Sequence, residues 1–309
     1  GGAVAIVGAA LVRGGTYTGN RATSSGGAVY GEAGSVVLGG TYTANTSGEG
    51  GGALRFTTTG TVSDGTFIAN RADGAGGAID AGTFLTLIGG RFTENTSGSN
   101  PLGGGGAYAN NGASVTRTVF ERNVATNGDG GGLYVNTSAL DMSEATFVGN
   151  VAGGKGGGLR TRGAATIARS TFAANTATGN GGAVNADPGA LTVTNSTLVG
   201  NAATGSGGGL YAQGDLDLEF ATLVDNTAGS GSGDAVITAA SVTFEHVIFA
   251  GPGGRDNCAI GNSRTPSDAA SFDTGATCLS GSGAGSQSSV GRAALQLQSL
   301  ADNGGSTRT

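Results

Sequence analysis

The sequence predicts an all-β protein: a single-stranded, right-handed parallel β-helix of about ten coils with 25–26 residues each. Two repeated motifs carry this prediction. The first is a glycine pair followed closely by an apolar residue, as in GGAV, GGAL and GGGL. The second is an aromatic residue or Leu followed, after two variable residues, by Asn, as in FIAN and FVGN. Both recur at nearly constant spacing, and a fixed period of about 20–50 residues is typical of solenoids.

Three apolar positions in each repeat predict the inward face of the coils. One lies five residues before the aromatic motif and holds Val, Leu, Ile, Met or Phe. The fourth residue of the glycine motif forms a second column: Val4, Val29, Leu54, Ile79, Tyr108, Leu133, Leu159, Val184, Leu210 and Val236. The aromatic motif forms the third: Tyr17, Tyr42, Phe67, Phe92, Phe120, Phe147, Phe172, Leu198, Leu223 and Phe249. The alternating stretches between them predict about three short strands per coil, and parallel connections favour a right-handed rod.

The Asn of the aromatic motif predicts a ladder of side-chain hydrogen bonds along the rod. Asn tolerates left-handed backbone angles where the chain turns, and its amide both donates and accepts. The expected members are Asn20, Asn45, Asn70, Asn95, Asn123, Asn150, Asn175, Asn201 and Asn226. Pro252 takes the matching position in the tenth coil and cannot extend the ladder. We therefore expect a regular β-helix over residues 1–250 and a C-terminal cap or final irregular coil over 251–309.

Composition and charge narrow the range of functions. The 309 residues carry a formal net charge of −6, which disfavours nucleic acid as a partner because nucleic-acid binding needs a basic face. No apolar run is long enough for a transmembrane segment, and the sequence shows no signal peptide. Since residue 1 already lies within a repeat, we expect a mature or excised segment of a longer protein. Cys258 and Cys278 predict a disulfide in an oxidising compartment, with buried free thiols as the alternative.

The paired glycine and FxxN repeats resemble those of the chlamydial polymorphic outer-membrane proteins over residues 1–250, and similar repeats occur in bacterial secreted right-handed β-helix proteins. The segments DNCAIGNS at 256–263, TGATCLSG at 274–281 and LQSLADNGGSTRT at 297–309 are similar to the end of the β-helix in bacterial surface proteins with a choice-of-anchor region. The resemblance implies an extracellular or bacterial cell-surface location and a role in adhesion or surface structure.

Outward-facing charges are the candidates for chemistry, because parallel β-helices also include polysaccharide lyases and hydrolases, which need clustered carboxylates. Opposite charges are expected to meet between adjacent coils at three places: Arg162 beside Asp187, Arg55 beside Asp80, and Glu94 beside Arg122. Such pairs are first interpreted as surface ion pairs, each stabilising the fold by a few tenths of a kcal/mol. The alternative is a glycan-binding patch in which the tyrosines stack on sugar rings: Arg160, Arg162, Asp187, Tyr211 and Tyr134.

The sequence favours a non-enzymatic extracellular surface protein, that is, a structural stalk, an adhesin or a filament-forming subunit. A carbohydrate-binding or polysaccharide-degrading protein is the alternative. No catalytic residue, metal ligand or cofactor is assigned, since the single histidine, His246, has no clustered partners. Expected partners are glycans, cell surfaces or a second copy joined head to tail, because the coil at Gly1 has no preceding cap; an upstream segment supplying that cap is the alternative. Outward threonines also suggest an ice-binding ladder, which Arg91 and Val119 interrupt.

Overall fold

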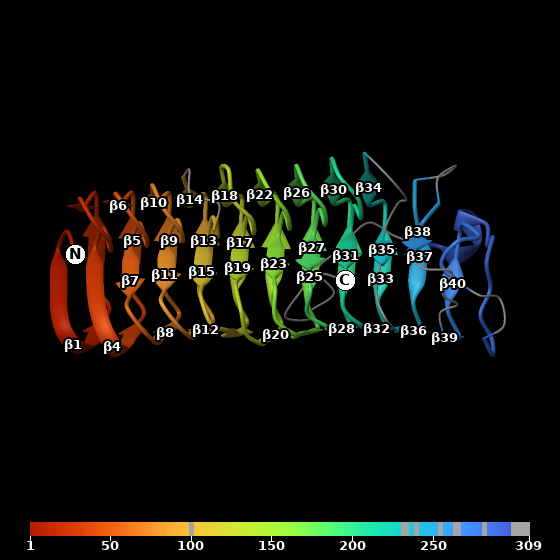
Figure 1. Cartoon of the computed structure of the whole chain (residues 1–309), viewed down its shortest axis with the longest axis horizontal. Helices are drawn as coiled ribbons and strands as arrows, with labels where there is room; N and C mark the ends of the chain where they lie inside the picture. Colours follow the sequence, from red (N-terminus) through yellow and green to blue (C-terminus); the bar gives the residue numbers. More distant parts are fainter. Residues whose placement is uncertain are drawn as a thin grey trace.

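The chain forms a parallel β-solenoid of about ten turns, which stack along the long axis from the N-terminal coil onward (Figure 1). The computed structural model describes residues 1–98, 102–229, 235–237, 241–252, 256–261, 267–279 and 283–297. Each regular coil contains four short strands, and every strand pairs in parallel with the equivalent strand of the next coil. The predicted fold class is therefore confirmed, while its right-handed winding stays a prediction.

The strands of successive coils align in four columns that make three sheets. The first and second columns share a 20-stranded sheet, the third forms an 11-stranded sheet and the fourth a nine-stranded sheet. The long strands β1 (Val4–Arg13) and β4 (Val29–Leu38) span the first two columns in their coils. The 3-10 helix η1 (Arg292–Leu295) follows the last strand.

The first column continues with β7 (Leu54–Phe56), β11 (Ile79–Ala81), β15 (Ala107–Ala109), β19 (Leu133–Val135), β23 (Leu159–Thr161), β27 (Val184–Ala186), β31 (Leu210–Ala212), β35 (Ala235–Ile237) and β38 (Cys258–Ile260). The second column contains β8 (Gly60–Ser63), β12 (Leu85–Ile88), β16 (Ala113–Thr116), β20 (Leu140–Ser143), β24 (Ala165–Ala168), β28 (Leu191–Thr194), β32 (Leu216–Glu219), β36 (Val242–Glu245) and β39 (Ser267–Ala269).

The third column contains β2 (Thr16–Thr18), β5 (Thr41–Thr43), β9 (Thr66–Ile68), β13 (Arg91–Thr93), β17 (Val119–Glu121), β21 (Thr146–Val148), β25 (Thr171–Ala173), β29 (Thr197–Val199), β33 (Thr222–Val224), β37 (Ile248–Ala250) and β40 (Phe272–Asp273). The fourth contains β3 (Arg21–Ala22), β6 (Thr46–Ser47), β10 (Arg71–Ala72), β14 (Thr96–Ser97), β18 (Val124–Ala125), β22 (Val151–Ala152), β26 (Thr176–Ala177), β30 (Ala202–Ala203) and β34 (Thr227–Ala228).

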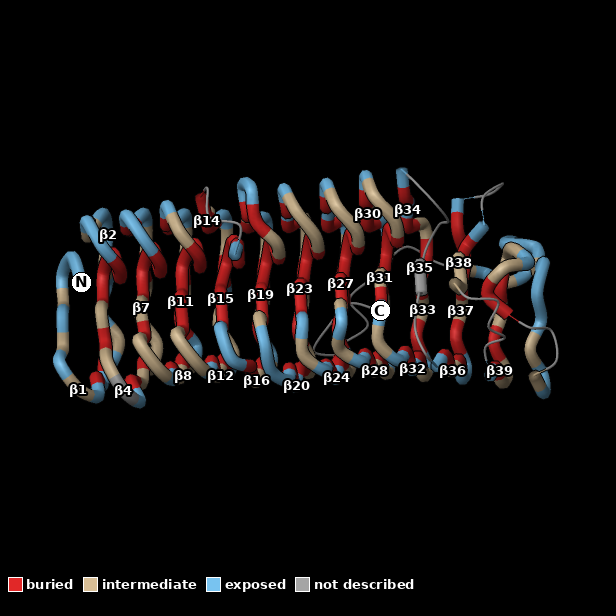
Figure 2. The backbone as a smooth tube through the Cα atoms, viewed as in Figure 1, coloured by how far each residue is buried: buried red, intermediate tan, exposed pale blue. Residues whose placement is uncertain are grey.

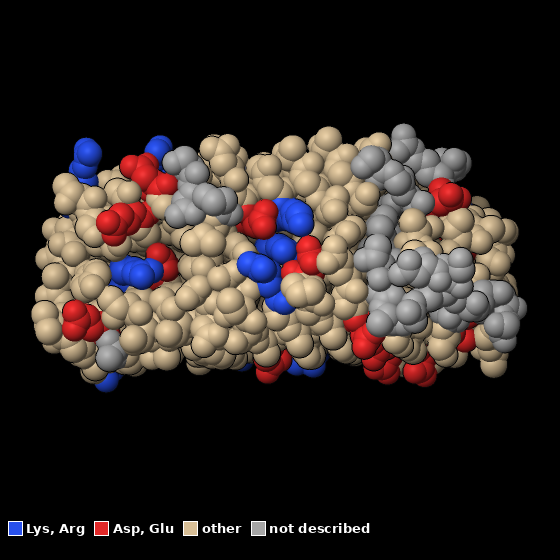
Figure 3. All heavy atoms as spheres, in the orientation of Figure 1, with Lys and Arg blue, Asp and Glu red and all other residues tan. Residues whose placement is uncertain are grey.

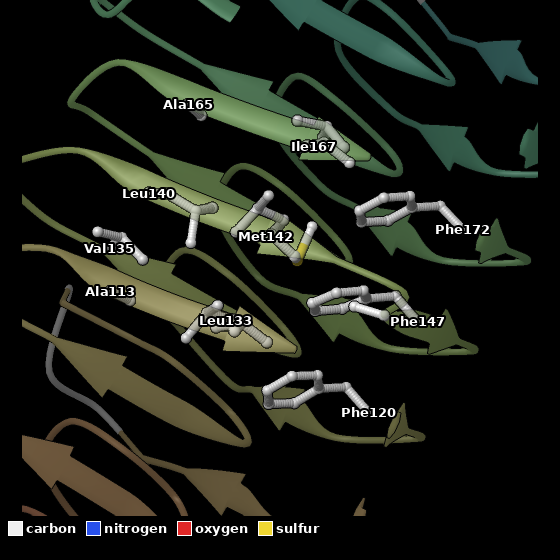
Figure 4. Close-up of a cluster of buried hydrophobic side chains, with 14 of the residues drawn as sticks. Ala113, Phe120, Leu133, Val135, Leu140, Met142, Phe147, Ala165, Ile167 and Phe172 are labelled. Atoms are coloured by element: carbon white, nitrogen blue, oxygen red, sulfur yellow. The ribbon is translucent and has the colours of Figure 1, made fainter. Parts of the chain in front are cut away.

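The core is a set of stacked columns inside the rod, visible as buried segments along every coil (Figure 2). The aromatic rings from Tyr17 to Phe172 lie face to face with centroids 4.6–4.9 Å apart. Figure 4 shows Phe120, Phe147 and Phe172 in this stack, beside the inward column that includes Met142 and Ile167. The predicted aromatic column, and the column five residues before it, are confirmed.

The glycine-motif column differs from the prediction in two coils. The register pairs Ile79 with Ala107, and not with Tyr108; it likewise pairs Leu210 with Ala235, and not with Val236. Four consecutive glycines at 103–106 allow two alignments of the motif. The structure places the small side chain of Ala107 inside, so that the polar phenol of Tyr108 lies on the outward side.

The fourth strand of each coil was not predicted, so the estimate of about three strands per coil is too low by one. Each of these strands has only two residues, and the inward one is always Ala or Ser, as in Ala72 and Ser97. A two-residue strand with a small inward side chain has no alternating pattern that the sequence could reveal.

The Asn ladder is confirmed from Asn20 to Asn226. At Asn70, the backbone N–H and Nδ2 donate to Oδ1 of Asn95, both at 2.9 Å, and Nδ2 also donates to the carbonyl oxygen of Tyr42 at 2.8 Å. Positive φ belongs to the residue before each Asn, for example 51° at Ala69. The ladder position therefore requires the amide group of Asn and not its tolerance of left-handed angles.

The glycine motif serves two conformational needs at its corner, as expected. The first glycine of the pair has positive φ, as at Gly51 with 65°. A Cβ atom on the second, Gly52, would collide with the carbonyl oxygen of Gly77 in the next coil. Side chains are thus excluded where the coils approach most closely.

The solenoid continues beyond Pro252 as an irregular coil. Among the residues that the structure describes, β34 is the last strand of the fourth column, whereas β38, β39 and β40 extend the other three. Cys258 and Cys278 form a disulfide in this coil, with Cα atoms 4.9 Å apart, as predicted. Arg292 donates to both carboxylate oxygens of Asp225, at 2.7 and 2.6 Å, and so fastens the segment that follows to a regular coil.

Candidate functional site

The candidate site lies on the outward side of the first-column strands, which we call the front face and which faces the viewer in Figure 1. The strand register aligns one outward side chain from each coil along this face: Tyr30, Arg55, Asp80, Tyr108, Tyr134, Arg160, Asn185 and Tyr211. Residues just after the strands form a second row beside it, which includes Asn110, Asn136, Arg162 and Asp187. Polar and aromatic groups therefore run along the rod axis.

A groove of about 800 Å³ lies on the N-terminal half of this face, between β7, β11 and β15 and the turns that precede them. Its lining includes Glu49, Arg55, Asp73, Asp80, Tyr108 and Asn110, and we call it the front groove. Both strand side chains and turn side chains reach it, because the turns before the glycine pairs stand beside the outward side of the strands.

Arg55 and Asp80 form the ion pair that the sequence predicted, at the base of the front groove. Asp80 is only 6% exposed, and its Oδ1 has no hydrogen-bond partner among the described residues. A Cβ atom on Gly50 would collide with Oδ2 of Asp80, so a glycine is needed there to admit the carboxylate. Burial raises the pKa of Asp80 to about 6, and the charge of Arg55 opposes that rise.

The raised pKa of Asp80 predicts a pH-dependent contribution to stability. Between pH about 4 and 6 the folded state retains a proton that the unfolded state has released, so the free energy of unfolding should fall as the pH rises through this window. The expected change is about 2–3 kcal/mol. Urea denaturation of wild type and Asp80→Asn at several pH values measures it, because the variant lacks this titration. A stability difference between the two proteins that does not change with pH would contradict the prediction.

The turns that flank the groove are acidic. Glu49 accepts hydrogen bonds from the hydroxyls of Ser24 and Ser25 at 2.8 and 3.0 Å, and these bonds lower its pKa. Asp73 pairs with Arg71 at 2.6 Å. The turns at the N-terminal end of the front face therefore carry two carboxyl groups in addition to that of Asp80.

A hydrogen-bonded track leads from the groove toward the C-terminal half of the front face. The phenol groups of Tyr108 and Tyr134 donate to Oδ1 of Asn110 and Asn136, at 2.9 and 3.0 Å, and the two rings meet edge to face at 5.4 Å. Nδ2 of Asn136 donates to Oδ1 of Asn110 at 3.0 Å. Arg162 donates to Oδ1 of Asn136 at 3.4 Å, which brings its guanidinium group to the end of the track.

The structure changes the expected role of Tyr134. Its side chain is 4% exposed and packs against Tyr108 in a cluster that also contains Ala75, so it does not offer an open ring face to a sugar. Burial raises the pKa of Tyr108 to about 12 and also raises the pKa of Tyr134, which keeps both phenols protonated as hydrogen-bond donors. Tyr211 is half-buried and accepts a hydrogen bond from Gln213 at 3.2 Å.

Basic side chains gather over β23, in the middle of the front face (Figure 3). Arg160 is 5% exposed and contacts Asn185, with Nε 3.3 Å from Asp129 and a terminal nitrogen 3.6 Å from Asp187. Lys155 lies 3.3 Å from the same oxygen of Asp187. The predicted pairing of Arg162 with Asp187 is wrong, because Lys155 and Arg160 occupy that carboxylate.

The structure also tests two predictions about the third column of strands: the ion pair of Glu94 with Arg122 and the interruption of the outward threonine column. Glu94 and Arg122 form the predicted ion pair at 3.0 Å. In the outward threonine column, Arg91 and Val119 stand in register between Thr66 and Thr146. The interruption that the sequence indicated is therefore present.

Sequence reasoning missed four contributors to the site. Tyr108 and Asn110 were assigned to the wrong positions because the glycine motif of their coil was misaligned. Lys155 and Asp129 lie in turns, outside the repeated strand positions. The four-glycine run at 103–106 was the signal for the first two, since it permitted the alternative alignment.

His246, the single histidine, stacks on Phe220 with ring centroids 4.5 Å apart. Within the part of the chain that the structure describes, no group of three or more His, Cys, Asp or Glu residues could hold a metal ion. No helix among the described residues is long and apolar enough to cross a membrane.

Comparisons with protein-family models, with curated proteins and with solved structures give no significant match. The parallel β-solenoid is shown by the stacked parallel strands of the chain. The similarity to the polymorphic outer-membrane proteins, and with it a secreted bacterial origin, stays a prediction from the repeat motifs.

Proposed function

We propose that the protein is a non-enzymatic, extracellular rod of a bacterial cell surface that binds carbohydrate along its front face, as an adhesin would. The observation that carries this proposal is the front groove and its continuation into the Tyr–Asn track. Arg55, Asp80 and Asn110 place two charged groups and an amide beside Tyr108 in one open depression.

The chemistry of the groove suits an extended glycan. Sugar hydroxyls donate and accept at the same time, and amide, carboxylate and guanidinium groups pair with them. The outward positions of the first column recur from coil to coil with the spacing of the inner ring stack, 4.6–4.9 Å, which is close to the length of one sugar unit. A polysaccharide laid along the rod would therefore pass a different outward side chain at each coil.

One observation favours the alternative, a polysaccharide-degrading enzyme. The pKa of Asp80 is raised while that of Glu49 is lowered, and carboxyls separated in this way act as acid and base in glycosidases. However, Oδ1 of Asp80 is inaccessible to solvent, and Oδ2 is held by Arg55. A general acid must come within hydrogen-bond reach of the bond it protonates, so this arrangement supports binding more than catalysis.

A glycan array tests the proposal, with a double variant that changes the groove and a matched control that does not. Arg55→Gln with Asn110→Ala should weaken binding of the captured glycan by about tenfold or more, because several hydrogen bonds to the sugar are lost. Arg122→Gln, which breaks a similar cross-coil ion pair in the third column, should bind as wild type does. Unchanged binding by the double variant, or no glycan bound by wild type, would contradict the proposal. Turnover of a polysaccharide that Asp80→Asn abolishes would instead support the enzymatic alternative.

A role as a stalk or filament stays part of the proposal. Among the described residues, β1 pairs with β4 alone, and its Val7 and Leu11 side chains are 91% and 56% exposed. An open strand edge of this length is a template for another strand. Either a preceding segment of the native protein or a second copy of the rod could pair with the open edge of β1.

A further inference from the structure

We infer that the glycan is anionic, and that Arg162, in the basic cluster around β23 that also contains Lys155, binds carboxylate or sulfate groups of the glycan at the C-terminal end of the track. This inference rests on the proposed function, because it identifies the ligand class of the same face. The described contacts of the two side chains carry it.

The basic cluster is a local exception in an acidic protein. The chain has 15 Lys and Arg residues against 21 Asp and Glu, and Lys155 is the sole lysine. Around β23, three cations, Lys155, Arg160 and Arg162, face two carboxylates, Asp129 and Asp187. The local balance is thus opposite in sign to that of the whole chain, and such a patch attracts anions over a distance of about a Debye length, roughly 10 Å.

Arg162 carries the positive charge that the cluster leaves unbalanced. Arg160 and Lys155 compensate Asp129 and Asp187. Arg162 is exposed, and its side chain donates a hydrogen bond to Asn136 at 3.4 Å and also hydrogen-bonds the phenol of Tyr134. A guanidinium group has five N–H donors in a planar fork that matches carboxylate and sulfate oxygens, so most of the donors of Arg162 remain available to a ligand.

Arg162 lies at the end of the Tyr–Asn track, so its charge is close to the proposed path of the glycan. Asn136 links it to Asn110 and therefore to the front groove. An acidic group bound at Arg162 would belong to a chain whose neighbouring sugars lie over Asn136 and Asn110. The cluster is in this way an extension of the groove and not a separate anion site.

The opposite end of the face disfavours acidic groups. Glu49, Asp73 and Asp80 line the front groove, and Arg55 is the one cation among the described residues of its lining. Like charges raise the free energy of an anionic ligand there, while the cluster at β23 lowers it. The two ends thus set an orientation in which the acidic sugars lie toward Arg162 and uncharged sugars occupy the groove.

The test compares three soluble probes of equal length by isothermal titration calorimetry with the full chain: oligogalacturonate, the corresponding neutral galactose oligomer, and a sulfated galactose oligomer. At low salt the anionic probes should bind about tenfold more tightly than the neutral one, and added salt should reduce that difference. Arg162→Gln and Lys155→Ala should each lower the affinity for the anionic probes toward that of the neutral oligomer. Arg122→Gln, an exposed arginine on another face, is the control and should retain the preference.

The outcomes separate this inference from the proposal on which it rests. Equal affinity for neutral and anionic probes, with binding that still depends on Asn110, would overturn the anionic ligand and leave carbohydrate binding intact. A preference for anions that survives Arg162→Gln would overturn the assignment to this cluster. Absence of binding to all three probes and to the glycan array would overturn both. Preference for the carboxylated or for the sulfated probe identifies the acidic group.

Discussion

Replacing Phe147 with Ala is expected to lower the free energy of unfolding by about 3–5 kcal/mol. The ring is fully buried, and its centroid lies 4.6 Å from that of Phe120 and 4.8 Å from that of Phe172. Truncation removes the apolar contacts of the ring and leaves a cavity between two rings whose positions are fixed by their own strands. Chemical denaturation followed by circular dichroism measures the loss.

Phe220→Ala is the matched control for this experiment. Phe220 is half exposed and stacks on His246 at the surface, so its truncation should cost about 1 kcal/mol or less. Equal losses for the two substitutions, or a Phe147→Ala protein as stable as wild type, would contradict the inward register of the aromatic column.

Asn150→Ala is expected to lower the free energy of unfolding by about 3–5 kcal/mol, although it removes far less apolar surface than Phe147→Ala does. Oδ1 of Asn150 accepts from the backbone N–H and Nδ2 of Asn123, and Nδ2 of Asn150 donates to the carbonyl oxygen of Phe120 and to Asn175. The substitution leaves several of these buried groups without a partner, each at a cost of about 1–3 kcal/mol. Chemical denaturation measures the total, and amide hydrogen exchange should show the loss of protection centred on the coils of Asn123 and Asn150.

An Asn at the surface provides the control. Asn127 is exposed in a turn, and Asn127→Ala should change the free energy of unfolding by less than about 0.5 kcal/mol. If Asn150→Ala were equally mild, the ladder would be a consequence of the stacked strands and not a source of their stability.

Much of the fold could be predicted because the structural requirement repeats with the coil. Phe147 and Asn150 are each constrained by equivalent residues one coil away, so the same residue types return at the same spacing. The two-residue strands could not be found in this way, since a buried Ala such as Ala152 in β22 leaves no recognisable pattern. The alignment at Tyr108 failed for a related reason: consecutive glycines have no side chains to fix the register.

The candidate site was predictable only where its contacts follow the repeat. Arg55 and Asp80 occupy equivalent positions of adjacent coils, and their ion pair was expected. Lys155 reaches Asp187 from a turn 32 residues earlier in the chain, a separation that no repeat specifies. Side-chain length and direction decide such contacts, and a periodic sequence pattern contains neither.

The most direct test of carbohydrate binding along the front face is a crystal structure of the full chain with bound oligogalacturonate. We expect sugar rings along the row from Arg55 to Arg162, with the carboxylates of the sugars turned away from the front groove and at least one carboxylate paired with the Arg162 guanidinium. An oligosaccharide bound over another sheet, with the front face empty, would contradict it.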